Sequence, residues 1–303
     1  MQDWRRNSGF FASLAVPPVA WLLLLFLVPL GGVWLLSFGQ NTGLTEITVT
    51  GTLANYQRAL EPLYLEIMLK SLWIAGATTM ICLIAGFPVA LAIVFAPPRA
   101  KTWLLLLVML PFWTNLLIRT YALIAVLRTN GFLNAGLGWL WDGLSGLLAL
   151  LGLGSLAPFQ PLHLLYTDFA VVFGLVYVHL PFMVLPLYAA LERIDRSLIE
   201  ASLDLGAGHL RTLAYVVCPL ALPGIISGVI VTMVPALGAY LTPDLLGGPS
   251  SQLIANVIER QFKRANDWPF GAALSFLLMY ATFIALFVRA AVARSRGGGG
   301  AAL

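Results

Sequence analysis

Long uncharged stretches alternate with short charged ones along this chain. Six of them are long enough, or nearly so, to cross a bilayer, because a hydrocarbon core of about 30 Å needs about 20 helical residues. They are Phe10–Phe38, Ser71–Ala96, Thr102–Ile118 with an extension past Arg119 to Leu127, Phe169–Leu191, Thr212–Pro243 and Trp268–Val288. Lipid cannot satisfy the backbone groups of open sheets or loops, so helices are expected. The pattern predicts an all-α, polytopic membrane protein with six transmembrane helices.

A seventh apolar stretch, Gly143–Ala157, is shorter and rich in Gly and Ser. It lies between Asp142 and Pro158, and a stretch of this length is typical of an interfacial or re-entrant segment. These two alternatives stay open from the sequence alone.

The basic residues predict the orientation of the spans. With the N-terminus inside, ten of the 17 Lys and Arg residues fall on the inner side and seven on the outer side. The bias is clearest in the short loop Pro97–Lys101, which carries two basic residues and no acid. The positive-inside rule therefore favours cytoplasmic N- and C-termini.

Composition agrees with a membrane protein. The chain is 60% hydrophobic and 10% charged, whereas soluble domains carry about 25% charged residues. The net charge of +4 is too small to indicate a nucleic-acid partner. Cys82 and Cys218 lie in or beside apolar runs and are expected to pack as small hydrophobic side chains. The first apolar stretch exceeds the core of a signal peptide, about 7–15 residues, and is expected to remain as a span.

The charged segment Arg196–Pro219 interrupts the apolar pattern. Upstream and within it, one apolar stripe recurs at helical spacing, while Glu192, Arg196 and Glu200 occupy another face. The stripe consists of Leu191, Ile194, Leu198, Ala201 and Leu205. The spacing predicts a helix from Glu192 to Leu205, a break at Gly206 and Gly208, and a second helix from His209. Such a segment is either an amphipathic linker on the membrane or a helix–turn–helix that docks into a groove of a soluble partner.

Three kinds of site are missing from the sequence. The chain has no Gly-rich loop ending in Gly-Lys-Ser/Thr, so it cannot bind ATP in the Walker manner, and it has no Ser–His–Asp or metal-ligand spacing. Apart from Arg119 in the extension of the third, the six core runs contain His179 as their sole Asp, Glu, Lys, Arg or His side chain. It lies beside Pro181 and is expected to be structural rather than a proton relay. Energy for any transport is therefore expected from a partner.

The charged segment Arg196–Pro219 resembles a motif of bacterial ABC importers. Their permease subunits carry E-A-A, three residues, G, nine residues, then I-x-L-P. This chain has Glu200-Ala201-Ser202, three residues, Gly206, nine residues, then Val216-Val217-Cys218-Pro219. Ser202, Val216 and Cys218 replace Ala, Ile and Leu of the motif. In that family the loop is a coupling helix that docks into the ATPase subunit. The resemblance implies an ATPase contact made by Glu200, Ala201, Ser202, Asp204 and Gly206.

The resemblance extends over most of the chain. Several strings are similar to permeases of the spermidine/putrescine type, in particular their B-type subunit. They are Pro111–Tyr121, Tyr166–Tyr188, Pro219–Ile230, Asp244–Gly248 and Asp267–Ala273. The resemblance implies a type I importer permease in the bacterial inner membrane that moves polyamines inward by alternating access. The alternatives are the same fold importing another small solute, and a stand-alone secondary transporter.

The resemblance also implies an assembly. The expected partners are a homologous second permease, two ATPase subunits, an extracytoplasmic substrate-binding protein and membrane lipid, but no nucleic acid. This chain is not expected to be an enzyme or to bind a cofactor, since ATP and Mg²⁺ would bind the partner ATPase. We expect one permease domain over 1–296, with a coupling segment at 192–211, and a flexible tail at 297–303.

A polycationic cargo would need carboxylates, carbonyls and aromatic faces along its path. Pro111 should kink the third span, and the fifth is broken by Pro235, Gly238 and Pro243; such broken helices usually line a cavity. The candidate path residues are Trp113, Asn115, Tyr121, Tyr240 and Asp244. The alternatives are an interfacial aromatic for Trp113 and a capping carboxylate for Asp244. Asp168 and Asp267 are expected to be N-caps, and Arg119 is expected to extend to the outer interface.

Overall fold

The computed structural model describes residues 8–42, 46–152, 154 and 156–297; Arg5, Arg6 and tail residues 298–303 lie outside this range. The chain divides into two compact units, which are described separately below. The first comprises Met1–Leu65 and Val257–Leu303, and the second comprises Glu66–Asn256.

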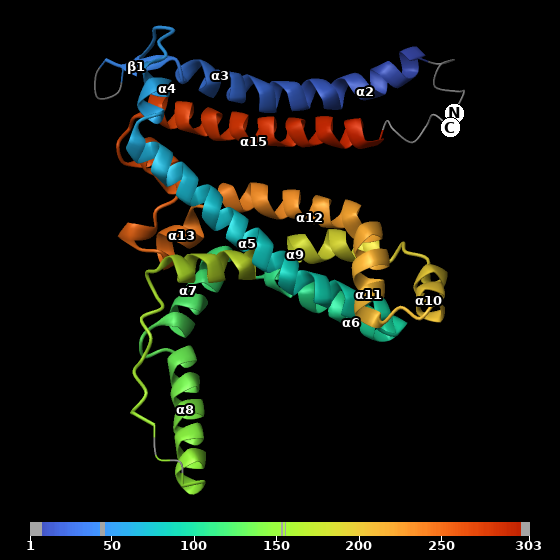
Figure 1. The fold of residues 1–303 in the computed structure, drawn as a ribbon. Coiled ribbons are helices and arrows are strands. Elements are labelled where there is room, and N and C mark those ends of the chain that lie inside the picture. The colour runs from blue at the N-terminus through green and yellow to red at the C-terminus, as the bar shows by residue number, and fades with distance from the viewer. Residues whose placement is uncertain (1–7, 43–45, 153, 155, 298–303) are drawn as a thin grey trace. The chain divides into compact units, whose positions relative to one another are not determined.

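The first unit joins the two ends of the chain. Helix α2 (Ser8–Leu22), the π-turn η1 (Leu23–Leu27) and helix α3 (Val28–Leu36) follow one another. A short antiparallel pair, β1 (Gly39–Asn41) and β2 (Ile47–Val49), leads to α4 (Ala54–Ala59). Helix α15 (Trp268–Gly297) packs against α3 and α4, and Figure 1 shows it running beside the first helices. The indole of Trp34 in α3 donates a 2.7 Å hydrogen bond to the hydroxyl of Tyr280 in α15.

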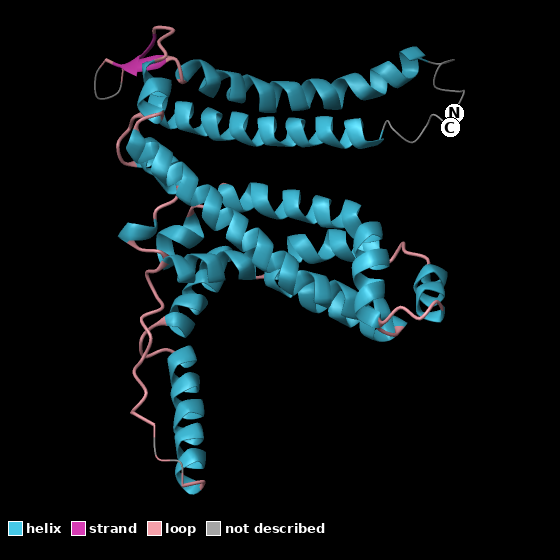
Figure 2. Ribbon diagram, in the orientation of Figure 1, coloured by secondary structure: helices cyan, strands magenta, loops and turns pink. Residues whose placement is uncertain are grey.

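The regular secondary structure of the second unit is entirely helical, with loops between the helices (Figure 2). Its elements are α5 (Pro62–Phe95), α6 (Pro98–Met109), the 3-10 turn η2 (Leu110–Trp113), α7 (Leu116–Leu127), α8 (Phe132–Leu150), α9 (Asp168–Leu191), α10 (Arg196–Asp204), α11 (His209–Thr212), the π-turn η3 (Leu213–Val217), α12 (Cys218–Leu237), α13 (Leu241–Leu246), the 3-10 turn η4 (Pro249–Ser251) and α14 (Ile254–Lys263). The first turn of α5 (residues 62–65) and most of α14 (residues 257–263) belong to the first unit.

The core of the second unit forms where α9 and α12 lie against each other. Met183 and Leu187 of α9 are fully buried there with Ala221 of α12. Gly224 and Gly228, one turn apart on α12, allow the close approach, because a Cβ at either position would collide with α9. Small residues at this spacing are typical of packed membrane helices.

The predicted multi-pass helical architecture is confirmed. Five helical stretches of the described chain are long and apolar enough to cross a membrane, and a shorter apolar helix follows. The long stretches are Ser13–Leu36, Pro62–Phe95, Leu116–Leu150, Asp168–Leu191 and His209–Leu237, and the shorter one is Trp268–Ile284.

Two predicted spans break earlier in the structure than their uncharged runs do. The third does not continue from Thr102 to Ile118, because the helix ends at Met109 and Thr114 is extended at φ −95° and ψ 143°. The fifth ends at Leu237 instead of Pro243, and α13 is a separate helix. In both places prolines remove backbone donors and favour a break.

Candidate functional site

A helix–turn–helix formed by α10 and α11 follows the end of α9. Asp195 caps α10, since its carboxylate accepts a 3.0 Å hydrogen bond from the backbone N–H of Ser197. This bond, with that from the Ser197 hydroxyl, lowers the pKa of Asp195. The cap corrects the predicted helix start at Glu192: residues 192–195 form a turn, and Leu191 and Ile194 join the core rather than the stripe of α10.

Gly206 ends α10 in a left-handed conformation, with φ at +84°. The backbone N–H of Gly206 bonds to the oxygen of Leu203 at 2.9 Å, and that of Ala207 bonds to the oxygen of Ser202 at 3.1 Å. This pair of bonds is the Schellman motif, which places glycine just past a helix end. The hydroxyl groups of Ser202 and Thr212 lie 3.0 Å apart and tie α10 to α11. The predicted break at Gly206 is therefore present.

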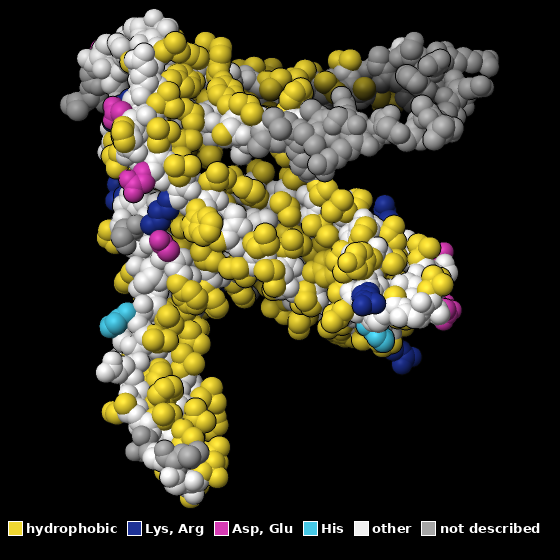
Figure 3. Space-filling model, in the orientation of Figure 1, with side chains coloured by type: hydrophobic (Ala, Val, Ile, Leu, Met, Phe, Trp, Pro, Cys, Tyr) yellow, Lys and Arg dark blue, Asp and Glu magenta, His cyan; other side chains and the backbone are white. Residues whose placement is uncertain are grey.

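The outward side of this segment presents apolar and charged groups together. Leu205 is 89% exposed and Leu210 is 83% exposed. Glu200, Ala201 and Asp204 are exposed as well, whereas Ser202 is half-buried. Figure 3 shows charged side chains around α10 and α11, in contrast to the hydrophobic flanks of the longer helices. Apolar side chains exposed in this way occur at protein-binding and at membrane-binding surfaces.

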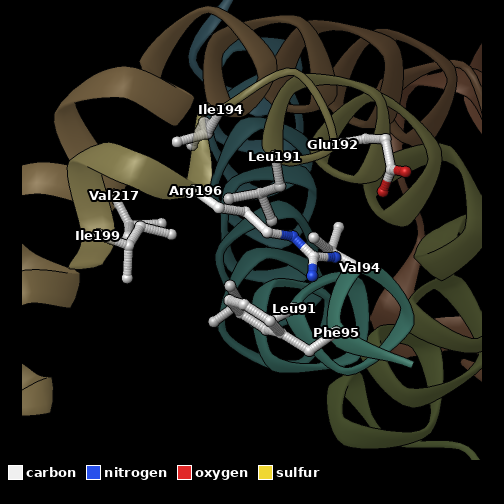
Figure 4. A pocket seen from close by; sticks show the side chains of 9 residues that line it. All are labelled: Leu91, Val94, Phe95, Leu191, Glu192, Ile194, Arg196, Ile199 and Val217. Carbon is white, nitrogen blue, oxygen red and sulfur yellow. The ribbon is translucent and has the colours of Figure 1, made fainter. Parts of the chain in front are cut away.

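A pocket of about 60 Å³ lies between α10 and the ends of α5 and α9. Its walls are apolar side chains together with Glu192 and Arg196. The lining residues are Leu91, Val94, Phe95, Leu191, Glu192, Ile194, Arg196, Ile199 and Val217. Figure 4 shows the Arg196 side chain extending across this pocket toward Val94 and the end of α5. The first residue of α10 thus reaches the body of the unit.

An ion pair connects α6 to the end of α9, where the α10 segment begins. The Lys101 ammonium lies 2.7 and 2.8 Å from the two carboxylate oxygens of Glu192. It also lies 5.9 Å from the centre of the Tyr188 ring. Glu192 is the residue after α9, so this pair joins the start of α6 to the residue from which the α10 segment departs.

The first candidate path group lies at the break between α6 and α7. Trp113 and Tyr121 are exposed. The Asn115 side chain caps α7 by accepting a 2.8 Å hydrogen bond from the backbone N–H of Leu117. An unbonded amide in a span is costly, and the Asn115 amide finds its partner at the N-terminus of α7.

Arg119 differs from its expected position. It is buried rather than extended to the interface. Its guanidinium donates hydrogen bonds to the backbone oxygens of Pro111 and Thr114 and to the Thr114 hydroxyl, and it lies 5.8 Å from the centre of the Tyr177 ring. The carbonyls freed by the helix break attract a cation, so the break itself accounts for the burial. Pro111 and Thr114 upstream of an in-span Arg were the signal for this arrangement.

The second group lies at the break between α12 and α13. Tyr240 and Asp244 are both exposed, and the backbone oxygen of Tyr240 accepts a 2.7 Å hydrogen bond from the amide of Asn256. Asp244 lies in the first turn of α13. Because α13 packs against α7, both breaks are at the same end of the second unit (Figure 1).

Three further sequence expectations have an outcome. Asp267 caps α15, where it accepts a 3.3 Å bond from the backbone N–H of Phe270. Asp168 is not the N-cap of α9; Thr167 caps that helix, and Asp168 pairs with Lys70 at 3.0 Å. His179 is buried with Nδ1 2.8 Å from the Leu175 backbone oxygen, as expected of a structural histidine. Within the described residues, no His, Cys, Asp and Glu side chains cluster in a way that could hold a metal.

Comparison with known proteins places this architecture among transporters. Residues 77–297 match the model of the family described as binding-protein-dependent transport system inner membrane component. The spermidine/putrescine transport system permease protein PotB of Escherichia coli (strain K12) is 40% identical over 91% of this chain and 94% of its own length. PotB of Haemophilus influenzae is 38% identical over 93% of each chain.

A solved structure is similar at the level of the fold. It is a bacterial ABC transporter involved in the import of the acidic polysaccharide alginate, with a TM-score of 0.67 and 16% identity. The match covers 97% of this chain and 98% of the other. Such a likeness concerns the fold and not the cargo.

Proposed function

The chain belongs to the family of binding-protein-dependent transport system inner membrane components, and we propose that it is a permease subunit of an ATP-driven importer for polyamines such as spermidine and putrescine. The observation that supports polyamines as the cargo is the 40% identity to a spermidine/putrescine permease across 91% of this chain. In this role the chain forms part of the translocation path and is not itself an enzyme.

We infer that α10 is the coupling helix that docks into an ATPase subunit. The motif residues on it and in the turn after it would make the contact, namely Glu200, Ala201, Ser202, Asp204 and Gly206. Support comes from the Schellman turn at Gly206 and from the exposed Leu205 beside carboxylates. The chain has no P-loop, so ATP and Mg²⁺ would bind the partner and their energy would enter through this contact.

The proposed assembly follows from the family. Two homologous permeases would pair in the bacterial inner membrane, two ATPases would bind from the cytoplasm, and an extracytoplasmic binding protein would deliver cargo. In this chain α15 would be the sixth transmembrane helix of a type I arrangement, with both termini cytoplasmic. The distribution of Lys and Arg supports that orientation, and the pairing of α15 with α3 and α4 supports a membrane position for α15.

Transport would proceed by alternating access between two states of the permease pair. Closure of the ATPase dimer would move α10, and the ion pair of Lys101 with Glu192 would pass that movement to α6 and α9. The cargo would pass Trp113, Asn115, Tyr121, Tyr240 and Asp244, where aromatic faces offer cation–π contacts of about 0.5–2 kcal/mol. Contacts of this size let a polycation enter and leave.

Uptake of labelled spermidine and putrescine into proteoliposomes with the complete complex tests the proposal. Uptake that requires ATP hydrolysis and the binding protein is the expected result. Uptake driven by an ion gradient without the ATPase would instead indicate a secondary transporter. ATP-dependent uptake of another solute, without uptake of polyamines, would agree with the permease role and contradict the assignment of polyamines as the cargo.

A further inference from the structure

Helix α8 and residues 156–167, which we call the return segment, form a hairpin at the end of the second unit opposite α10 (Figure 1). The return segment covers one face of the helix. The indole of Trp141 donates a 2.8 Å hydrogen bond to the Ala157 backbone oxygen, and the Ser145 hydroxyl accepts a 3.1 Å bond from the Leu156 N–H. The amide of Asn134 exchanges bonds of 2.9 and 3.0 Å with the Leu162 backbone. The hairpin is therefore tied together along its length.

The opposite face of α8 carries large apolar side chains that nothing in the described chain covers. Phe132 is 78% exposed, Trp139 is 77% exposed and Leu150 is 86% exposed. With 3.6 residues per turn, positions 132, 139, 140, 147 and 150 fall on one side of the helix. Leu140 and Leu147 complete that group and are more than half exposed. We call these five residues the open face of α8.

The direction of α8 is unlike that of the spans. Figure 1 shows α9 and α12 running roughly parallel to each other, with α8 crossing their direction at the end of the unit. Figure 3 shows the hydrophobic side chains of α8 on the side toward which α9 and α12 extend, and the return segment lies on the other side. A membrane crossed by α9 and α12 would therefore meet the open face.

Charge distinguishes lipid from a protein partner for this face. Residues 129–167 contain Asp142 as their one acid and have no Lys or Arg. Protein interfaces enrich Arg among their anchors and surround an apolar centre with a polar rim. A helix that lies on a bilayer presents Trp, Phe and Leu to the boundary between headgroups and acyl chains. The open face matches the apolar side of such a helix, and the place of the polar side, commonly rich in Lys and Arg, is taken here by the uncharged return segment.

The return segment excludes deep insertion. Residues 156–165 form neither helix nor strand. Hydrocarbon gives no partners to the open backbone groups of such a segment. The hairpin can therefore place the open face in lipid only while the return segment stays at the water side, which is the geometry of an interfacial helix and not of a re-entrant loop.

We propose that α8 is an interfacial anchor: it lies in the plane of the membrane at the end opposite α10, with its open face buried in the adjacent leaflet. The occupant of the face is lipid, held by apolar burial and indifferent to headgroup charge because the hairpin has no basic residue. The anchor fixes the return segment at the membrane surface beside the breaks before α7 and α13. The inference rests on the membrane-spanning part of the proposed function and not on the cargo. Uptake assays test the cargo, and spin-label accessibility tests the anchor, so the failure of one is distinguishable from the failure of the other.

Site-directed spin labels on the reconstituted complex test the anchor. Trp139→Cys and Leu147→Cys report on the open face, and Gln160→Cys, exposed in the return segment, is the matched control, all in a Cys82→Ala, Cys218→Ser background. In phosphatidylcholine nanodiscs, collision with oxygen relative to a water-soluble nickel chelate should be several-fold higher at 139 and 147 than at 160. Phosphatidylglycerol should not change the ratio.

Two outcomes would overturn the anchor. One is a nickel accessibility at 139 and 147 equal to that at 160, which means that the face is in water. The other is protection from both reagents, which means that protein covers it. A photoreactive amino acid at position 139 of the chain with its own cysteines gives an independent answer, with lipid adducts expected and adducts to another subunit contradicting the proposal.

Discussion

The guanidinium of Arg119 donates a 2.9 Å hydrogen bond to the backbone oxygen of Thr114. This bond connects the first turn of α7 to the break that precedes the helix. The same group bonds the Pro111 oxygen at the end of the previous helix. One buried cation thus replaces the backbone donors that Pro111 and the extended Thr114 remove. We therefore expect the order of the break that presents Trp113 and Asn115 to depend on this residue.

Replacing Arg119 by Met should therefore impair transport through loss of order at the break. Hydrogen bonds to a charged group contribute about 1.5–3 kcal/mol each, so we expect a lower Tm of the purified complex and a reduced maximal uptake rate. Arg119→Lys should recover part of both, because an ammonium can still donate to one or two of the oxygens. Thermal unfolding and initial uptake rates provide the measurement, and wild-type values for Arg119→Met would show that the break is ordered by other contacts.

The ion pair of Lys101 with Glu192 should contribute little to global stability. Its side chains are 19% and 41% exposed, and ion pairs that water reaches contribute about 0–1 kcal/mol. In a double-mutant cycle with Lys101→Ala and Glu192→Ala, the coupling energy from unfolding should stay below about 1 kcal/mol. ATP-driven uptake should fall more clearly than stability, because the pair joins α6 to the base of α10. Equal loss in both measurements would give the pair a structural role alone.

The cap of α10 should depend on pH through Asp195. Its folded pKa is lowered by the N–H and hydroxyl of Ser197, so its contribution is present above the unfolded pKa of about 3.9 and is lost as pH falls through the folded value. Hydrogen exchange of the α10 amides, corrected for intrinsic rates, should show faster opening as the solution becomes more acidic. Asp195→Asn retains the cap without a titrating group, and its opening should not follow this pH dependence.

Much of the fold is predictable from the sequence because the length of each uncharged apolar run largely determines the helix that forms there. The limits of α9 agree with the uncharged run within one residue. The end of α10 at Gly206 was predictable too, since few residues other than glycine adopt the left-handed conformation. The start of α10 was not predictable in this way. The helical spacing of apolar residues includes Ile194, upstream of α10, whereas the cap at Asp195 determines where the helix begins.

Two other features required the tertiary structure. Arg119 has the sequence pattern of a residue that extends to the interface, and its burial depends on carbonyls that become free only when the helix breaks at Thr114. Helix α8 starts at Phe132, upstream of the apolar run Gly143–Ala157. The helical spacing of Phe132, Trp139 and Leu147 was the available signal, and glycine-rich composition obscured it.

Asp244 provides a test of the path that is independent of docking. Replacing it by Asn keeps the size of the side chain and its place in the first turn of α13, while it removes the charge that would attract an ammonium group. We expect a several-fold higher half-saturation concentration for spermidine than for the wild type, with basal ATPase activity retained. Concentration-dependent uptake provides the measurement, and unchanged kinetics would place the cargo path elsewhere.

The pair Gly206 and Gly208 allows a matched test of coupling. Gly206 has φ at +84°, whereas Gly208 has φ at −71° and ψ at 157°, which any residue adopts. A Cβ would meet nothing within 4 Å at either position, so backbone strain is the difference between them. A left-handed residue with a side chain costs about 1–2 kcal/mol, and more when it is β-branched.

We expect Gly206→Val to separate ATP hydrolysis from uptake in a complex that still inserts and assembles, and Gly208→Ala to leave both near wild type. Uptake and ATPase rates from the same proteoliposomes measure this ratio. Equal effects of the two substitutions, or full uptake by Gly206→Val, would show that the turn after α10 does not transmit the motion of the ATPase.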